Sequence, residues 1–264
     1  MNNLLQVILL GVIEGITEFL PISSTGHLLI AERLGLGARS ELFNIVIQAG
    51  AILAITVIYR ERLWQLARGM RDRETRDYGL KLLVAFLITA VLGMVLAKLG
   101  AELPETVGPV AWALIIGGFW MLLAERLAAR HAGETHVGWP AAVAVGIAQI
   151  VAGVFPGTSR SASTIFAAML CGTSDRKAAA EFAFLVGIPT MYAASGYALL
   201  KQAKHGFGNE NFGDMAIAFV VSTLTAFIAV KWLMRYIQTH RFTAFAVYRI
   251  VLGVALLLLV SEPG

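Results

Sequence analysis

The chain has 264 residues, of which 58% are hydrophobic and 14% are charged, and its formal net charge is +4. Soluble domains carry about 25% charged residues, so this composition excludes an ordinary soluble domain and predicts a polytopic, all-α integral membrane protein. The basic residues lie in short loops between apolar stretches, which argues against nucleic-acid binding, and the single cysteine, Cys171, excludes an internal disulfide.

The first apolar region, residues 4–34, is interrupted by a polar stretch at residues 21–27 (PISSTGH). Each arm of this region is shorter than the roughly 17–25 residues that cross a bilayer. Polar backbone at membrane depth is tolerated only where protein buries it or where it lines a wet cavity. We therefore expect a re-entrant helix–turn–helix pair here.

Two carboxylates lie on the first arm of this region. Glu14 and Glu18 are four residues apart, so they share one face of a helix. Two carboxylates repel each other at membrane depth, and a divalent cation between them would relieve that repulsion. Mg²⁺ and Ca²⁺ take oxygen ligands, and Mg²⁺ is often held by one or two carboxylates together with phosphate oxygens. We predict a divalent-cation site at Glu14 and Glu18; the alternative is a polar face closed by neighbouring helices.

Hydroxyl groups and one imidazole follow the break. Ser23, Ser24 and Thr25 offer hydroxyls at the start of a helix, where backbone N–H groups also bind anions. His27 could act as nucleophile, as general acid or base, or as a hydrogen-bond donor to phosphate. A cluster of this kind is often only a helix N-cap. Its position in a broken membrane helix, nine residues or fewer from Glu18, favours a phosphate site.

Further along the chain, three uninterrupted apolar stretches are followed by a second interrupted region and three more stretches. The six expected membrane spans are 42–59, 80–99, 108–124, 182–200, 214–234 and 242–260. The second interrupted region, 141–171, is broken at residues 156–161 (PGTSRS). We predict another re-entrant pair there, which meets the first inside the protein.

Arg160 lies in this second break, between hydroxyl side chains. A guanidinium offers planar donors that match phosphate oxygens, and hydroxyls add further donors. The hydroxyls that we expect to bind phosphate together with Arg160 are those of Ser159, Ser161 and Thr164. The alternative is an arginine that extends to the membrane surface, which fits poorly because the segment is not at the end of a long span.

The two interrupted regions resemble each other at an offset of 135 residues. Residues 11–24 (GVIEGITEFLPISS) align with residues 146–159 (GIAQIVAGVFPGTS), which places Arg160 opposite Thr25. We therefore predict a single membrane domain, 1–264, with an inverted repeat of two units at about 1–130 and 136–264. Each unit is a re-entrant helix pair plus three transmembrane helices, and the odd number of spans inverts the second unit. Secondary transporters share such repeats, so a lipid-phosphate flippase or transporter is the alternative function.

Lysine and arginine predict the orientation of the chain in the membrane. Five of these residues lie in one set of loops, and we expect the more basic set to be cytoplasmic, so that both termini and the mouth of the first re-entrant pair face outward. The more basic set has fourteen: Arg60, Arg62, Arg68, Arg71, Arg73, Arg76, Lys81, Arg126, Arg130, Arg176, Lys177, Lys231, Arg235 and Arg241.

Residues 14–27 (EGITEFLPISSTGH) and 156–164 (PGTSRSAST) resemble the two signatures of the bacterial undecaprenyl-diphosphatase family, the bacitracin-resistance type. The resemblance covers essentially the whole chain, and the two signatures together are highly specific. It implies that undecaprenyl diphosphate is hydrolysed to undecaprenyl phosphate and inorganic phosphate. It further implies a divalent metal, a site on the periplasmic side of the bacterial inner membrane, and a role in recycling the lipid carrier for peptidoglycan synthesis.

The resemblance also implies roles for individual residues. It makes Glu14 and Glu18 the metal-binding and catalytic carboxylates and Arg160 the phosphate clamp. The further residues that it places in the site are His27, Ser24, Ser159 and Thr164. The sequence leaves the nucleophile open between His27, Ser24 and a metal-bound water, with a slight preference for His27. It leaves the oligomeric state open as well, with a homodimer as one option.

Overall fold

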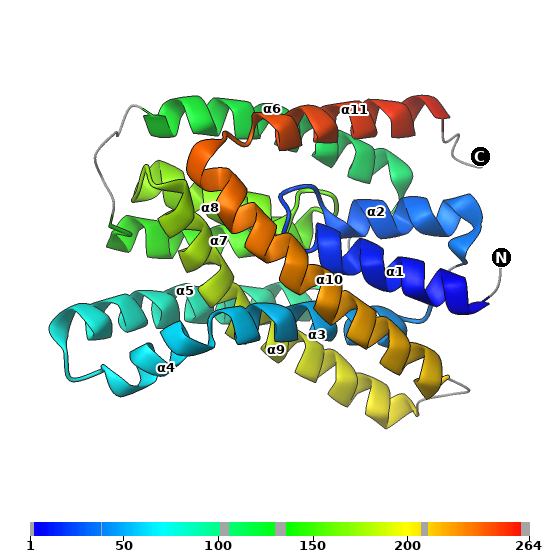
Figure 1. Ribbon diagram of the computed structural model, residues 1–264, viewed down its shortest axis with the longest axis horizontal. Coiled ribbons are helices and arrows are strands. Elements are labelled where there is room, and N and C mark those ends of the chain that lie inside the picture. The colour runs from blue at the N-terminus through cyan, green and yellow to red at the C-terminus, as the bar shows by residue number, and fades with distance from the viewer. Residues whose placement is uncertain (1–2, 38, 101–105, 130–135, 207–210, 260–264) are drawn as a thin grey trace.

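The computed structural model describes residues 3–37, 39–100, 106–129, 136–206 and 211–259, and every regular element within these ranges is a helix (Figure 1). Five of the helices are long and apolar enough to cross a membrane. They are α3 (Glu41–Ile58), α5 (Arg73–Lys98), α6 (Val107–Ala128), α9 (Arg176–His205) and α10 (Phe212–Thr239). The sixth expected span forms α11 (Thr243–Leu259), which has 17 residues and lies at the lower limit of a spanning length.

Some helices are longer than the apolar stretches that predict them. The expected span 80–99 begins seven residues earlier, at Arg73, because Asp72 accepts a hydrogen bond from the Thr75 backbone N–H (2.9 Å) and caps the first turn. Asp175 caps the start of α9 in the same way. The segment before α5, expected as a loop, contains the short helix α4 (Arg60–Arg68). Charged residues with good helix propensity continue these helices beyond the apolar core.

Both expected breaks are confirmed. The first apolar region forms α1 (Asn3–Thr17) and α2 (Ser24–Ala31), followed by the short π-helical segment η1 (Glu32–Leu36). The second forms α7 (Trp139–Val154) and α8 (Arg160–Cys171). In Figure 1 the two pairs occupy the middle of the molecule, and their turns meet between the long helices. The long helices therefore shield two polar turns at the centre of an apolar protein.

Small residues let the broken helices pack closely against long ones. On α1, an added Cβ at Gly15 would collide with Thr225 of α10, and Thr225 Oγ1 donates to the Gly11 carbonyl (3.4 Å). On α7, Gly146 packs against α5, where Thr89 Oγ1 donates to its carbonyl (3.0 Å). The threonine–glycine contacts of α1 and α7 are alike, as expected if one unit was duplicated. The inverted repeat itself stays a prediction.

The largest apolar cluster lies beneath the two turns. Phe19 of the first turn packs edge-on against Phe184 of α9, with ring centroids 5.5 Å apart, and both side chains are fully buried. Burying an aromatic side chain of this kind stabilises the fold by about 1.5–3 kcal/mol. This packing fixes the first turn against α9. Three predicted features lie outside the described residues: Arg130, both chain ends and most of the junction between the two halves.

Candidate active site

Each turn ends in a serine that caps the following helix. Ser23 Oγ accepts a hydrogen bond from the Gly26 N–H (3.3 Å), and Ser159 Oγ accepts one from the Ala162 N–H (3.3 Å). Both serines have a positive φ, 75° and 70°, and they are the only non-glycine residues in the described part of the chain that do. Such a backbone costs about 1–3 kcal/mol at each residue and is concentrated at functional sites.

The two turns contact each other directly. Ser161 Oγ donates to the Leu20 carbonyl (3.0 Å), and Arg160 Nη2 donates to Glu18 Oε1 (3.0 Å). Ser24 Oγ donates to the other carboxylate oxygen, Glu18 Oε2 (2.6 Å). The prediction that the two re-entrant pairs meet inside the protein is therefore confirmed, and Glu18 is the group that joins them.

The structure changes the expected alignment of the two turns by one residue. The capping serines, Ser23 and Ser159, are 136 positions apart rather than 135. Arg160 therefore corresponds to Ser24 and not to Thr25. The first residue of α2 and the first residue of α8 both donate to the same carboxylate.

A cavity of about 190 Å³ lies where the turns meet, and a second cavity of about 590 Å³ adjoins it. Ser24, Thr25 and Gln48 line both of them. The smaller cavity is also lined by Glu18, Ser23, Gln149, Ala152, Gly153, Gly157, Ser159 and Arg160. The larger one contains Glu14 and opens along Glu32, Arg39 and Glu41. Most of the predicted site residues therefore share one continuous polar space.

Glu14 is the group best suited to a cation. Its side chain is 2% exposed, and its Oε2 is buried with no hydrogen-bond partner within the described residues. It lies close enough to Glu18 and Arg160 to interact electrostatically with both. A buried carboxylate oxygen without a donor is costly, so this arrangement fits a metal ion. No group of three or more acidic, histidine or cysteine ligands occurs in the described ranges, so further ligands would come from water or phosphate.

The structure does not bring His27 into these cavities. Its Nδ1 lies 2.7 Å from the Ser23 carbonyl oxygen, and its Nε2 lies 2.7 Å from the Tyr248 hydroxyl. Because a carbonyl can only accept, Nδ1 donates, and Nε2 of the neutral ring accepts from Tyr248. The nitrogen lone pair that a nucleophile would need is therefore occupied.

Two of the expected phosphate-binding hydroxyls also have structural partners. Ser161 donates to the Leu20 carbonyl, and Thr164 Oγ1 donates to the carbonyls of Arg160 and Ser161 within α8. Both side chains are 1% exposed, and neither lines a cavity described above. They hold the turn in place, whereas Ser24, Thr25 and Ser159 face the polar space.

Sequence reasoning missed Gln48 and Gly187. Gln48 lines both cavities from α3, and the signal for it is a polar residue in the middle of the apolar stretch 42–59. Gly187 of α9 leaves room for Arg160, because an added Cβ would lie 2.5 Å from Arg160 Nη1. No pattern in the sequence points to Gly187, since its role depends on how α9 packs.

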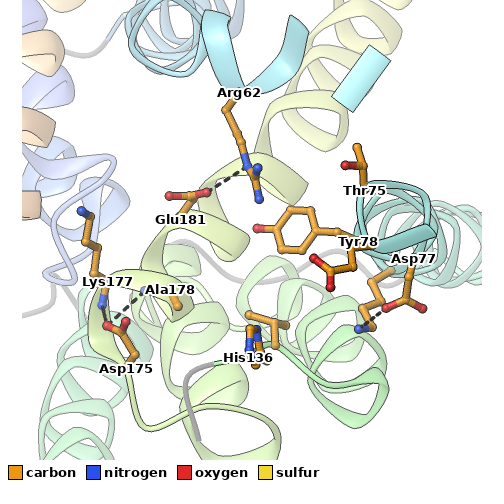
Figure 2. A pocket seen from close by; sticks show the side chains of 12 residues that line it. Arg62, Thr75, Asp77, Tyr78, His136, Asp175, Lys177, Ala178 and Glu181 are labelled. Carbon is orange, nitrogen blue, oxygen red and sulfur yellow. Dashed lines mark hydrogen bonds and ion pairs between the residues drawn. The ribbon is translucent and has the colours of Figure 1, made fainter. Parts of the chain in front are cut away.

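A third cavity, of about 690 Å³, contains none of the predicted site residues (Figure 2). Its charged groups are mostly paired with each other. Arg62 lies 3.3 Å from Glu181 and stacks over Tyr78, and Lys81 pairs with Asp77 at 2.6 Å. Because Arg62 and Lys81 are already neutralised, this cavity has less attraction for a phosphate group, and the space between the two turns remains the candidate active site.

Comparison with known proteins gives a consistent result. A family model described as bacitracin resistance protein BacA matches residues 7–255. A protein of Xanthomonas oryzae pv. oryzae (strain PXO99A), named undecaprenyl-diphosphatase, is 64% identical over 259 residues, which cover 98% of this chain and 97% of that protein. One of Rhizobium etli (strain CIAT 652) with the same name is 68% identical over 250 residues, which cover 94% of each chain.

Proposed function

We propose that this chain, which belongs to the bacitracin resistance protein family BacA, is a multi-pass membrane phosphatase that hydrolyses undecaprenyl diphosphate to undecaprenyl phosphate and inorganic phosphate. One observation carries the proposal beyond the similarity. Glu18 joins Ser24 of the first turn to Arg160 of the second in a polar cavity, within a protein built largely of apolar helices. This is the activity that recycles the lipid carrier for cell-wall synthesis, and family members are linked to bacitracin resistance by name.

The cavity suits the terminal phosphate of a diphosphate. Arg160 provides a guanidinium that can bind phosphate oxygens through two parallel hydrogen bonds. Thr25 and Ser23 add hydroxyl donors along the same wall. The Ser159 hydroxyl donates to Ser161 Oγ (3.1 Å), because Ser161 itself donates to the Leu20 carbonyl. Phosphoryl transfer depends mainly on positioning and on neutralising charge, and these side chains do both.

Ser24 is the nucleophile that the geometry favours. Its Oγ donates to Glu18 at 2.6 Å, which is the arrangement of a hydroxyl and its general base. As Glu18 accepts the proton, Ser24 Oγ bonds to the terminal phosphorus, and the bond from that phosphorus to the bridging oxygen breaks. Undecaprenyl phosphate leaves with the bridging oxygen. Water then cleaves the phosphoserine, inorganic phosphate is released, and Glu18 returns the proton to Ser24.

A divalent cation, Mg²⁺ or Ca²⁺, is part of this proposal. Glu14 and Glu18 would hold it, and the unpaired Oε2 of Glu14 is the observation that supports it. When bound, the cation would offset negative charge on the diphosphate. Without such a ligand the buried Oε2 of Glu14 would lack a partner, which is costly. Cation binding would therefore explain why a carboxylate is buried at this position.

The orientation in the membrane is also a proposal. In Figure 1 the start of α1 and the end of α11 lie at one end of the molecule, and α4 lies at the other. Arg60, Arg62 and Arg68 of the predicted cytoplasmic set belong to α4. We place the protein in the bacterial inner membrane with the cavity of Glu14 open to the periplasm. The homodimer stays a prediction that this arrangement does not address.

The first experiment measures phosphate release from undecaprenyl diphosphate by the protein purified in detergent, with and without Mg²⁺ or Ca²⁺. Wild-type protein should release phosphate only with a cation, and Glu18→Ala and Arg160→Ala should abolish release. A folded protein that releases no phosphate with any cation would overturn the phosphatase proposal and favour the transporter.

The nucleophile is tested separately. Ser24→Ala should lose the reaction, and wild-type protein quenched in acid after reaction with substrate labelled on the terminal phosphate should carry label on Ser24. Thr25→Ala is the comparison variant: Thr25 lines the same cavities without a hydrogen bond to Glu18, so its loss should weaken phosphate binding and still leave label on Ser24. Activity that survives in Ser24→Ala would assign the attack to water instead.

A further inference from the structure

The strained turns need partners that hold them. The positive-φ backbone conformations of Ser23 and Ser159 are unfavourable in isolation, and such conformations persist only where surrounding groups fix them. Ser161 supplies one such contact by donating to the Leu20 carbonyl. Two further contacts come from adjacent residues of α11, Tyr248 and Arg249, which the mechanism above does not use.

Arg249 binds the backbone of the second turn. Its side chain is fully buried, and its Nη2 donates to the Gly157 carbonyl (3.0 Å) and to the Ala113 carbonyl of α6 (3.1 Å). Gly117 makes room for it, since an added Cβ there would collide with the guanidinium. No ion pair found in the described residues includes Arg249. A buried arginine without a carboxylate partner is expensive, and the Gly157 carbonyl that Arg249 binds lies three residues before Arg160 in the chain.

Tyr248 contacts the first turn indirectly, through His27. Its hydroxyl lies 2.7 Å from His27 Nε2, the two rings are stacked at 5.6 Å, and His27 Nδ1 donates to the Ser23 carbonyl. His27 thereby fixes the carbonyl of the strained residue that precedes Ser24. The chain of contacts runs from α11 to the proposed nucleophile without entering the cavity.

We propose that Tyr248 and Arg249 are positioning residues, which hold the two turns in register so that Ser24, Glu18 and Arg160 stay within reach of one phosphate. This inference rests on the proposed function. It also gives His27 a role, as the link between Tyr248 and Ser23, in place of nucleophilic attack. Adjacent positions on one helix can couple the two turns because α11 packs against α6, which itself contacts α2 and α8.

The experiment compares kcat, KM and the melting temperature of wild-type protein with those of Tyr248→Phe, Arg249→Lys and Gly117→Ala. Tyr248→Phe removes one hydroxyl from a half-exposed ring, so it should lower kcat about tenfold while KM changes less than about threefold and the melting temperature barely changes. Arg249→Lys cannot reach both carbonyls and should lower kcat about a hundredfold. Gly117→Ala should resemble it, because it displaces the guanidinium without removing it.

Two controls separate positioning from general damage. Tyr197→Phe removes a hydroxyl from an exposed ring of α9, and Gly196→Ala adds a methyl group where nothing lies within 4 Å; both should leave kcat unchanged. In a double-mutant cycle, Tyr248→Phe should add nothing to His27→Ala, since both interrupt the same chain of contacts. Additive losses, an unchanged kcat in Tyr248→Phe, or losses that only follow the folded fraction would overturn the inference. If the wild-type protein does not hydrolyse undecaprenyl diphosphate, the proposed function itself is wrong.

Discussion

The described part of the chain contains two pairs of a buried glutamate and a partly buried arginine with similar local chemistry. Glu18 accepts hydrogen bonds from Arg160 (3.0 Å) and from a serine hydroxyl. Glu125 accepts them from Arg176 (2.8 Å) and from the Phe242 backbone N–H (3.3 Å). The side-chain exposures also agree, at 5% and 6% for the glutamates and 19% and 28% for the arginines. Each pair connects segments that are far apart in the sequence.

The surroundings of the two pairs differ. Beside Glu18 lies Glu14, whose buried oxygen has no donor, and the pair borders a polar cavity between two strained turns. Glu125 and Arg176 connect α6 to the start of α9 and line none of the three cavities described above. A buried ion pair alone therefore does not identify an active site. Unpaired neighbours, strained backbone and an accessible cavity distinguish the pair that can bind a ligand.

Neutralising each glutamate is the sharpest test of this contrast. Glu18→Gln should lower kcat by about 10³-fold or more, because it removes both the proton acceptor for Ser24 and the charge that holds Arg160. Glu125→Gln should leave kcat per folded molecule within about threefold of wild type. It should instead lower stability by about 2–4 kcal/mol, since Arg176 keeps its charge without a partner. Phosphate release and thermal melting in detergent measure the two effects.

This prediction fails in either of two ways. If Glu125→Gln loses activity without losing stability, the second pair takes part in function and the comparison is wrong. If Glu18→Gln unfolds the protein and the remaining folded molecules are fully active, Glu18 is a structural residue.

Replacing each arginine by lysine sharpens the same comparison with a smaller change. Arg160→Lys keeps the positive charge but loses the planar pair of donors, so kcat should fall by about 10²–10³-fold. Arg176 approaches Glu125 through Nε in the structure, and a lysine ammonium can form a single bond of that kind. Arg176→Lys should therefore retain most activity and lose about 1 kcal/mol of stability. Equal activity losses in both variants would contradict the assignment of phosphate binding to Arg160 alone.

The sequence contains the local signals of the site but not its three-dimensional contacts. Spacing predicts that Glu14 and Glu18 share a helix face, and the two interrupted apolar regions predict broken helices, because both depend on neighbouring residues. The partners of His27 and Ser161 could not be predicted. Tyr248 lies 221 residues from His27 in the chain, and only the packing of α11 brings them together.

Helix limits and the exact correspondence of the turns were also beyond the sequence. Apolar length predicts where a helix crosses the membrane, but capping by Asp72 and Asp175 decides where α5 and α9 begin. The alignment by sequence placed Arg160 opposite Thr25, because the positive φ and the capping roles of Ser23 and Ser159 are visible only in the structure. Such one-residue differences leave the chemistry of a motif intact while changing which side chain faces the cavity.

Cation binding tests the role of Glu14, whose unpaired Oε2 distinguishes the surroundings of the Glu18–Arg160 pair from those of the Glu125–Arg176 pair. A cation that binds only folded protein raises the melting temperature in proportion to the logarithm of its concentration. Mg²⁺ or Ca²⁺ should stabilise the wild type and Glu125→Gln equally, whereas Glu14→Gln should lose most of this stabilisation and lower kcat by about 10²-fold. If Glu14→Gln is stabilised like the wild type, the cation binds elsewhere and the proposed ligands are wrong.

Gln149 gives the smallest and most selective test. It aligns with Glu14 in the predicted repeat, it is 4% exposed, and its Nε2 donates to Thr89 Oγ1 (2.8 Å). Its Oε1 is buried, has no hydrogen-bond partner among the described residues and belongs to a residue that lines the smaller cavity, so it resembles the unpaired oxygen of Glu14. Gln149→Met keeps the size of the side chain and removes this acceptor. We expect stability to rise by up to about 1 kcal/mol, because an unsatisfied buried oxygen is lost.

The same substitution should lower kcat about tenfold if Oε1 accepts a hydrogen bond from water or from a protonated phosphate oxygen during the reaction. Opposite changes in stability and activity are the signature of a group kept for function. Thr89→Val is the control, since it releases the Gln149 amide without removing the acceptor, and should lower kcat less. A fall in both stability and activity for Gln149→Met would show that Gln149 supports the packing of α7 on α5. It would then belong with Glu125 among the residues that hold the protein together.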